Sequence, residues 1–280
     1  MEVTFFGTRG SCPCAGEGYG IYGGNTSCGL VRLDGSDPLI LDLGTGLRRV
    51  SDVLCETSAP VHVAALLTHL HFDHIMGLPF FTPLHVPGSR LTVHGPSQAG
   101  STLRQTLAGA VKPPFFPVEL VSFRGQIELL DTADEDFSLG PYKVRSRAVP
   151  HLGHTLGFRV EAGGRALAYV SDHQAPPDRR SVPESVLELC DGADLVVHDA
   201  QFSDEEFEKK PHWGHSTVGY AVQVAAESGA RQLLLFHHDP SHADRDVERL
   251  AEWARGLPAA TRLQKVTAAR EGVTIDLGRQ

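Results

Sequence analysis

Four side chains of the kinds that bind metals lie close together in the sequence, directly after an apolar segment. They are His69, His71, Asp73 and His74, and imidazole and carboxylate groups are the ligands that zinc and similar first-row metals prefer. At the end of a strand, side chains two residues apart point to the same side, so the first two histidines would face one position. A turn into a helix would then let Asp73 and His74 face a neighbouring position. The spacing therefore favours a site for two adjacent metal ions over solvent-exposed loop histidines.

The cluster must be positioned by the apolar run before it, Val61–Thr68, which is typical of a buried strand. The carboxyl end of a strand is where α/β folds place their functional sites. Similar short runs recur along the chain and predict further strands. These are Val3–Thr8, Gly29–Asp34, Pro38–Gly44, Leu91–His94, Tyr142–Val149, Arg165–Ser171, Asp194–Val197, Gln232–Phe236 and Gly272–Leu277.

Helical periodicity completes the predicted element order. The predicted helices are Gly46–Leu54, Thr102–Val111, Val182–Leu189, Ser216–Ser228 and Ala243–Arg255, with Ser216 or Thr217 as the cap of the fourth. In each half of the chain strands come first and are then mixed with helices, which suits packed sheets with helices outside. No linker rich in proline, glycine or serine interrupts the chain, so residues 1–280 are expected to form one α/β domain.

Charge and composition narrow the class of function. The formal net charge of the 280 residues is −9, whereas a general nucleic-acid binder needs a basic face to displace counterions from phosphates. A small anionic substrate stays compatible, because metal ions supply positive charge locally. The amino terminus does not resemble a signal peptide, and no apolar run reaches the length of a membrane span. Five cysteines suit reduced thiols. A cytoplasmic protein is therefore expected.

The complete pattern His-x-His-x-Asp-His at residues 69–74 resembles the signature of the metallo-β-lactamase superfamily. The resemblance implies a four-layer αββα sandwich, in which two mixed sheets pack together between outer helices. Four more segments resemble features of the same family: residues 38–44, 150–158, 169–172 and 235–240. In the first of them, the aspartate (Asp42) is expected to hydrogen-bond a metal-ligand histidine and fix its tautomer.

The family resemblance implies seven ligands for two divalent metal ions, with zinc expected and manganese or iron as alternatives. They are His69, His71 and His151 for one ion, Asp73, His74 and His237 for the other, and Asp172 as the bridge.

Two of these ligands involve a choice between neighbouring histidines. His151 is preferred to His154 because the family histidine lies six residues before the glycine of a Gly-aromatic pair, here Gly157. His237 is preferred to His238 because it directly follows an apolar run.

Two segments resemble motifs of ribonuclease Z and suggest the reaction. His215-Ser216-Thr217 resembles its His-Ser-Thr motif, and residues 197–201 resemble its His-Glu-Ala-Thr segment with Asp199 in place of glutamate. Cleaving a phosphodiester expels a poor alkoxide, to which a positioned imidazolium can give a proton. The resemblance therefore implies His215 as general acid and Asp199 as its orienting partner. The alternative is a solvent-facing ring beside a helix cap. A hydroxide bridging the metals would attack phosphorus, with Asp73 also orienting this nucleophile.

The substrate is expected to be a small or cyclic phosphodiester rather than transfer RNA. The region between His74 and His151 holds only scattered basic residues, unlike the long basic arm of the common ribonuclease Z. Residues 7–11, 22–26 and 237–240 instead resemble segments of small bacterial phosphodiesterase-like proteins. Arg9 and Asn25 are candidate substrate contacts.

Other interpretations stay open at this point. Cys12 and Cys14 could belong to a structural zinc site, although free thiols are favoured. A thioester, lactone or lactam hydrolase would share the metal motif, but a thiolate leaves without a proton and would not need His215. A non-hydrolytic accessory protein resembling the pyrroloquinoline-quinone synthesis factor is a further alternative. Family members often form dimers, so a homodimer is compatible with the resemblance.

Overall fold

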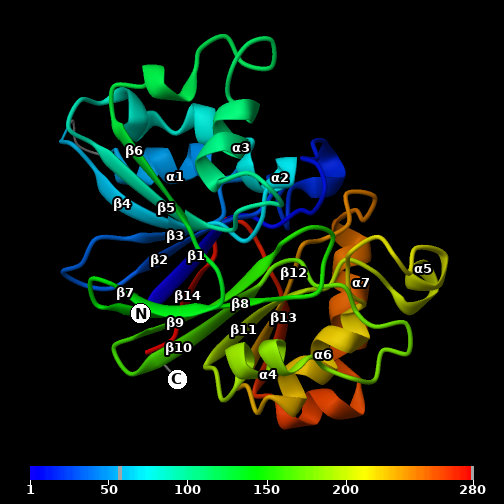
Figure 1. Cartoon of the computed structure of the whole chain (residues 1–280). Coiled ribbons are helices and arrows are strands. Elements are labelled where there is room, and N and C mark those ends of the chain that lie inside the picture. Colours follow the sequence, from blue (N-terminus) through cyan, green and yellow to red (C-terminus); the bar gives the residue numbers. More distant parts are fainter. Residues whose placement is uncertain (56–58, 279–280) are drawn as a thin grey trace.

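The computed structural model describes residues 1–55 and 59–278, which contain two seven-stranded sheets (Figure 1). The first sheet has the order β14–β1–β2–β3–β4–β5–β6 and the second the order β13–β12–β11–β10–β9–β8–β7. The strands of the first are β1 (Glu2–Gly7), β2 (Cys28–Arg32), β3 (Leu39–Leu41), β4 (His62–Leu66), β5 (Arg90–Gly95), β6 (Gln126–Asp131) and β14 (Thr274–Asp276). Those of the second are β7 (Glu135–Leu139), β8 (Tyr142–Ala148), β9 (Leu156–Ala162), β10 (Arg165–Val170), β11 (Leu195–Asp199), β12 (Gln232–Phe236) and β13 (Lys265–Ala268).

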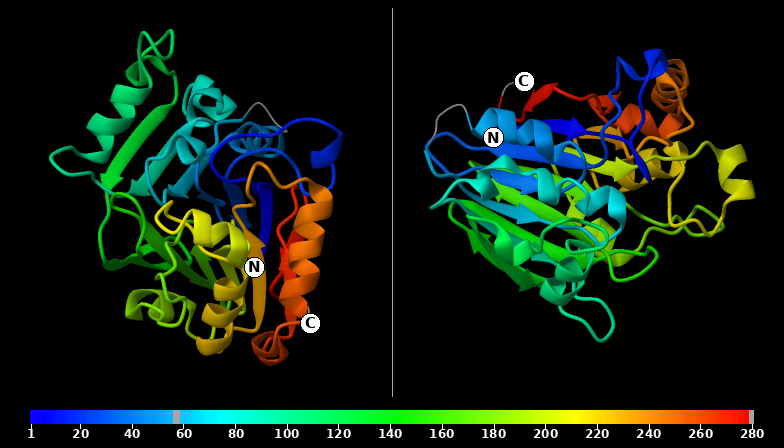
Figure 2. Two further views of the ribbon diagram at one scale, coloured as in Figure 1. Left: turned by 90° about the vertical axis from the view of Figure 1, so that its right-hand side faces the viewer. Right: turned by 90° about the horizontal axis from the view of Figure 1, so that it is seen from above.

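Helices cover the outer faces of both sheets and complete the predicted four-layer αββα sandwich (Figures 1 and 2). The α-helices are α1 (Leu47–Leu54), α2 (Phe72–Ile75), α3 (Leu103–Ala110), α4 (Glu184–Cys190), α5 (Asp204–Lys209), α6 (Val218–Glu227) and α7 (Asp244–Arg255). Short 3₁₀ helices are formed by Glu17–Tyr19, Leu78–Phe80, Thr82–His85, Leu120–Ser122 and Pro258–Arg262. Helices α1 and α3 pack on the first sheet, and α4, α6 and α7 on the second. None of the helices within residues 1–55 and 59–278 combines the length and the apolar character that a membrane span requires.

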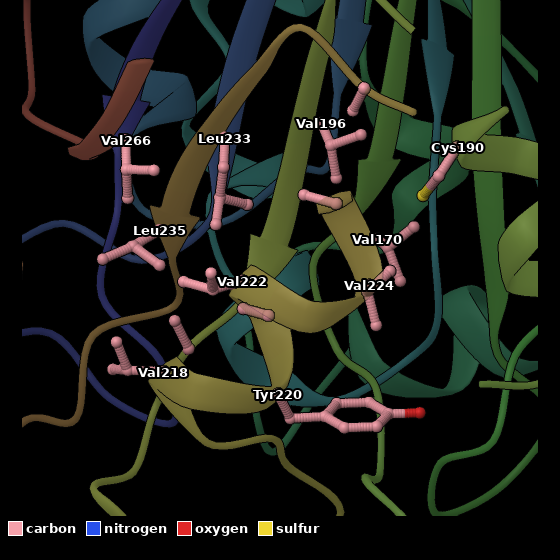
Figure 3. Packing of buried hydrophobic residues seen from close by; sticks show 14 of the residues in the cluster. Val170, Cys190, Val196, Val218, Tyr220, Val222, Val224, Leu233, Leu235 and Val266 are labelled. Carbon is pink, nitrogen blue, oxygen red and sulfur yellow. The ribbon is translucent and has the colours of Figure 1, made fainter. Parts of the chain in front are cut away.

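Three apolar layers hold this arrangement together. Between the sheets, the Phe236 ring lies 5.1 Å from that of Phe5 and 5.6 Å from that of Tyr169, measured between centroids. Outside the second sheet, buried side chains of α6 such as Val222 lie over β12, whose Leu233 and Leu235 point toward the helix (Figure 3). A third apolar cluster lies between the first sheet and its helices. Burying apolar surface on both faces of each sheet is the main stabilising contribution to such a sandwich.

The carboxyl ends of the parallel strands of both sheets lie at one edge of the sandwich. Strands β3 to β6 run parallel in the first sheet and β10 to β13 in the second. The residues that follow β3, β4, β10 and β12, together with the end of β11, carry most of the candidate ligands and their partners, and His151 follows the antiparallel strand β8. The fold therefore brings segments far apart in the sequence to one place, as is usual at the carboxyl ends of strands.

Most predicted elements match the structure to within a few residues, and Thr217 caps α6 by accepting a hydrogen bond from the Tyr220 amide. Four strands were not predicted: β6, β7, β9 and β13. Strands β6, β7 and β13 lie at sheet edges, where exposed polar residues replace the apolar ones of a central strand. Strand β9 is well buried, but its residues were interpreted only as part of a motif.

Arg9 is not the substrate contact that the sequence suggested. Its side chain is fully buried, and Nε donates to the Gly23 carbonyl at 2.8 Å while Nη1 donates to the His242 carbonyl at 2.6 Å. Its Nη2 lies 3.7 Å from Asp244 Oδ1. The guanidinium thus joins the segment after β1 to the loop after β12. Asn25 is also engaged within the protein, since its Nδ2 donates to Glu271 at 2.9 Å.

Replacing Arg9 with alanine is expected to destabilise the fold strongly. The variant would leave two carbonyl groups without their donor and Asp244 with only its bonds from the Ile21 and Tyr22 amides. Breaking a buried ion pair from one side costs about 3–5 kcal/mol. Urea unfolding should show this loss in the free energy of unfolding. Arg245 is the control, because its side chain is 89% exposed and lies 3.9 Å from Asp246. Equal stability of the Arg9→Ala and Arg245→Ala variants would contradict this account.

Candidate metal centre

The segment after β4 adopts the geometry that its spacing predicted. The chain is extended through His71, whose ψ is 150°, and then turns into the short helix α2. The rings of His69 and His71 lie 4.4 Å apart between centroids. Asp73 and His74 follow on the first turn of α2 and are buried. The four side chains therefore form two adjacent pairs.

His69, His71 and His151 form the first candidate metal group. Nδ1 of His71 lies 2.9 Å from Nε2 of His69 and 3.2 Å from Nε2 of His151. His151 Nδ1 donates to the Gly214 carbonyl at 2.6 Å, which leaves its Nε2 as a free electron pair facing the other two rings. Burial lowers the pKa of all three imidazoles. Neutral, converging ring nitrogens are the form that binds a metal.

Asp73, His74 and His237 form the second candidate group. Oδ2 of Asp73 lies 3.1 Å from Nε2 of His237 and 3.3 Å from Nε2 of His74. Burial works against the charged form of both imidazoles, but Asp172 and Asp73 together raise the pKa of His74 and of His237 above its ordinary value. Burial likewise works against ionisation of Asp73, yet His74 and His237 hold its pKa below the usual range. The carboxylates of Asp73 and Asp172 therefore stabilise positive charge at this position, which a bound cation can also supply.

Residues behind the second group fix the direction of each ligand. Asp42 Oδ2 accepts from His74 Nδ1 at 2.9 Å, as the sequence predicted, and Gln201 Oε1 accepts from His237 Nδ1 at 2.8 Å. The Ser11 amide donates to Asp73 Oδ2 at 2.8 Å. In each histidine Nδ1 is thus occupied as a donor, so Nε2 is the nitrogen that faces the site and that a metal ion would bind.

Asp42 is itself held by several donors. Its carboxylate accepts from the Thr68 amide at 2.8 Å, from the Thr68 hydroxyl at 3.0 Å and from the Tyr169 hydroxyl at 2.8 Å. Burial and the neighbouring Asp42 raise the pKa of Tyr169 well above its ordinary value, so its hydroxyl stays a donor. Asp42 adopts a φ of 58° and His237 one of 59°. Such left-handed backbone in non-glycine residues costs energy and is concentrated at functional sites.

Asp172 lies between the two groups. Its Oδ1 is 3.8 Å from Nε2 of both His69 and His151, and 3.3 Å from Nε2 of His237. Its Oδ2 is 3.1 Å from His74 Nε2, but within the described residues this buried oxygen has no hydrogen-bond partner. An unpartnered buried carboxylate oxygen is costly unless a cation satisfies it. Nitrogen and carboxylate donors in two converging groups around one carboxylate fit two zinc, manganese or iron ions.

His215 and Asp199 form a pair beside this cluster. Nδ1 of His215 lies 2.9 Å from Asp199 Oδ2, and its ring stacks on that of His237 at 4.9 Å. The ring is largely buried rather than solvent-facing. Asp199, Asp172, His215 and His237 also lie close enough to hold a metal. However, the carboxylate of Asp199 accepts from the backbone amides of His173 and Gln201 as well, which favours a role in holding His215.

His154 and His238, the two histidines that were not chosen as ligands, bond backbone carbonyl groups and belong to none of the candidate metal groups in the part of the chain that the structure describes. His154 Nδ1 bonds the Ser97 carbonyl at 3.0 Å and His238 Nε2 the Ala269 carbonyl at 2.9 Å. Burial lowers the pKa of His238 to about 3. All five cysteines have free thiols, and Cys12 and Cys14 belong to none of the candidate metal groups found among the described residues.

Three supporting residues were not identified from the sequence: Gln201, Ser11 and Tyr169. Gln201 stands in the segment that resembles His-Glu-Ala-Thr, but only its aspartate received a role. Ser11 acts through its backbone amide, which any residue type supplies, so no side-chain pattern could reveal it. Tyr169 lies in an apolar run and is indistinguishable there from a core aromatic residue.

Comparison with known proteins places this geometry in a family. Residues 40–238 match the beta-lactamase superfamily domain. The chain belongs to the metallo-β-lactamase superfamily. Within it the chain falls in the branch that contains ribonuclease Z and PhnP-like proteins.

Individual relatives of this superfamily member cover nearly the whole chain. A ribonuclease Z of Myxococcus xanthus is 31% identical, over 99% of this chain and 98% of the relative. The structure of a diphosphatase from the PhnP family has a TM-score of 0.70 at 21% identity, covering 98% and 97% of the two chains. Zinc-bound PqqB from Methylobacterium extorquens has a TM-score of 0.70 at 20% identity, covering 99% and 100%. At such identities the two structures establish the fold alone.

Metal content should distinguish the histidines of each neighbouring pair. We expect about two metal ions per chain in the wild type and fewer in the His151→Ala and His237→Ala variants, because each loses a converging ring nitrogen. His154→Ala and His238→Ala are the matched controls and should keep the wild-type content, measured by mass spectrometry of the metal. If His154→Ala or His238→Ala loses metal while the variant of the neighbouring histidine keeps it, the ligand of that pair has been chosen wrongly.

Asp42→Asn is expected to weaken metal binding although Asp42 contacts no metal position. An amide can present its NH₂ group to His74 Nδ1, which disturbs the tautomer, and such changes lower metal affinity about 10- to 100-fold. Competition with a chelator would measure the affinity. Asp52→Asn on α1 is the control, because that side chain is 70% exposed, and unchanged affinity in both variants would refute the supporting role of Asp42.

Proposed function

We propose that the protein is a metal-dependent phosphodiesterase that hydrolyses small or cyclic phosphodiesters. The observation that carries this proposal is the His215–Asp199 pair, which lies beside the two candidate metal groups with Nδ1 of His215 3.7 Å from Asp172 Oδ1. A hydrolase that expels an alkoxide needs a proton donor next to its metals. The family membership and the ribonuclease Z relatives support the same class of reaction.

Two divalent ions at this site would make bound water nucleophilic at neutral pH and neutralise charge on the phosphoryl group. The protein's own residues perform the remaining tasks. Asp73, held by the Ser11 amide, is placed to orient the attacking water. His215 in its doubly protonated form donates from Nε2 to the departing oxygen, while Asp199 accepts from Nδ1 and stabilises the positive ring. Because the ring is fixed by stacking on His237, the proton is delivered from one direction.

The alternative functions explain the His215–Asp199 pair less well than phosphodiester hydrolysis does. A thioester hydrolase would expel a thiolate, which needs no proton, and the His215–Asp199 pair would then be without a task. A non-hydrolytic accessory role does not require an acid beside the cluster, and each of the seven predicted ligands is present with its side chain directed to one of the candidate groups. The similarity to PqqB lies in the fold. The net charge of −9 argues against general nucleic-acid binding, so the proposed substrates are small.

The first assay compares bis(p-nitrophenyl) phosphate with p-nitrophenyl phosphate and a thioester, using metal-loaded protein. We expect turnover of the diester above that of the other two. Turnover of the thioester alone would keep the fold and overturn the proposed reaction.

The contribution of His215 should depend on the leaving group. In His215→Ala, kcat for methyl phenyl phosphate should fall about 10²- to 10⁴-fold, because phenolate is a poor leaving group. Methyl p-nitrophenyl phosphate should be affected much less, since p-nitrophenolate leaves more readily without a proton. His212→Ala is the control, because His212 is an exposed residue of the same loop. An equal loss on both substrates would argue against proton donation by His215.

A further inference from the structure

Three large exposed apolar side chains stand next to, or two residues from, candidate site residues in the sequence. Phe72 is 70% exposed, Leu152 53% and Trp213 59%. In the sequence Phe72 precedes Asp73, Leu152 follows His151, and Trp213 stands two residues before His215. Single exposed apolar residues are normal on protein surfaces, but three of them beside candidate ligands in the sequence offer apolar contacts of the kind that small-molecule sites use.

Trp213 stands on a loop that is firmly anchored to the site. Gln174 Oε1 accepts from the Gly214 amide at 2.7 Å, and its Nε2 donates to the Pro211 carbonyl at 3.0 Å. The Gly214 carbonyl in turn accepts from His151 at 2.6 Å. Gly214 has a φ of 94°, and a Cβ at this position would lie 2.6 Å from the His151 ring. These hydrogen bonds therefore hold the backbone that carries the exposed indole next to His151 of the first metal group.

Lys210 holds the indole in a defined direction. Its ammonium nitrogen lies 4.9 Å from the centroid of the Trp213 ring and 4.8 Å from that of Phe202, while Asp239 Oδ2 lies 3.6 Å away. The Phe202 ring contacts His215, with centroids 5.8 Å apart. Cation–π contacts of this kind orient an aromatic ring. One face of the indole thus lies against Lys210, and the exposed remainder is available to a ligand.

We propose that Trp213 stacks on a planar aromatic ring of the substrate, so that the preferred phosphodiester carries a nucleobase. The inference rests on the proposed phosphodiesterase function and names its substrate class. Aromatic side chains bind bases by stacking, and each stacked base contributes strongly and with little dependence on base identity. A ligand with one base suits this acidic protein better than a nucleic-acid chain does. Binding through one ring and one phosphate needs no extended basic surface.

Ligand binding can be followed through Trp213 itself. The chain has two tryptophans, so the Trp253→Phe variant leaves Trp213 as the single indole reporter. Zinc-loaded protein would be titrated with adenosine 5′-monophosphate and with ribose 5-phosphate, which has the same phosphate and sugar but no base. We expect the nucleotide to quench Trp213 fluorescence and to bind about 10-fold more tightly than the sugar phosphate. Equal affinities without quenching would overturn the proposal.

Replacing Trp213 tests the same point without fluorescence. By calorimetry, Trp213→Ala should lose about 10-fold in affinity for the nucleotide and leave that for ribose 5-phosphate unchanged. Trp253→Ala is the control, since Trp253 lies on α7 and is 43% exposed. Unchanged nucleotide affinity in Trp213→Ala would refute the stacking role.

Turnover measurements distinguish the base-binding role of Trp213 from the proposed phosphodiesterase activity. Adenosine 2′,3′-cyclic phosphate and the 2′,3′-cyclic phosphate of methyl riboside differ only in the base. We expect a KM about 10-fold lower for the nucleoside substrate, and a smaller difference in Trp213→Ala. Equal KM values with good turnover would refute the role of Trp213 and leave the phosphodiesterase proposal intact. Base-dependent binding without hydrolysis of either substrate would support Trp213 as a base-binding residue and overturn the reaction.

Discussion

The rest of the site depends on the buried carboxylate of Asp172. It lies between two groups of converging ligands, and burial strongly disfavours its charged form. His237 and His74 nevertheless hold its pKa well below the ordinary value. A second buried carboxylate, that of Asp73, lies against the same two histidines. Such a concentration of negative charge is stable only with compensating positive charge, which protonated histidines provide in part and divalent cations provide fully.

The two sheets contribute different parts of this arrangement. The first sheet supplies the residues after β4 and, through Asp42, the hydrogen bond that orients His74. The second supplies Asp172, His237 and the His215–Asp199 pair. Neither sheet alone carries a complete ligand group, since Asp73 and His237 meet only when the sandwich forms. The site is therefore complete only in the folded sandwich, and buried links between the two sheets stabilise both the fold and the site.

The contiguous cluster could be predicted from the sequence because four ligand types stand at a strand–helix transition, where local geometry alone makes them converge. The positions of His151, Asp172 and His237 depended on a family resemblance, because contacts between residues so far apart have no local signature. Arg9 was misjudged for a physical reason. A charged side chain is exposed by default, and its burial depends on carbonyl groups contributed by the loop after β12.

Whether the cluster binds two metal ions can be seen by anomalous diffraction from zinc-loaded crystals at the zinc edge. We expect two peaks about 3.5–4 Å apart. One should lie among the nitrogens of His69, His71 and His151, and the other beside Asp73, His74 and His237, with the Asp172 carboxylate between them. A single peak, or a pair in which Asp172 contacts neither ion, would show that the cluster is not a dinuclear centre bridged by this carboxylate.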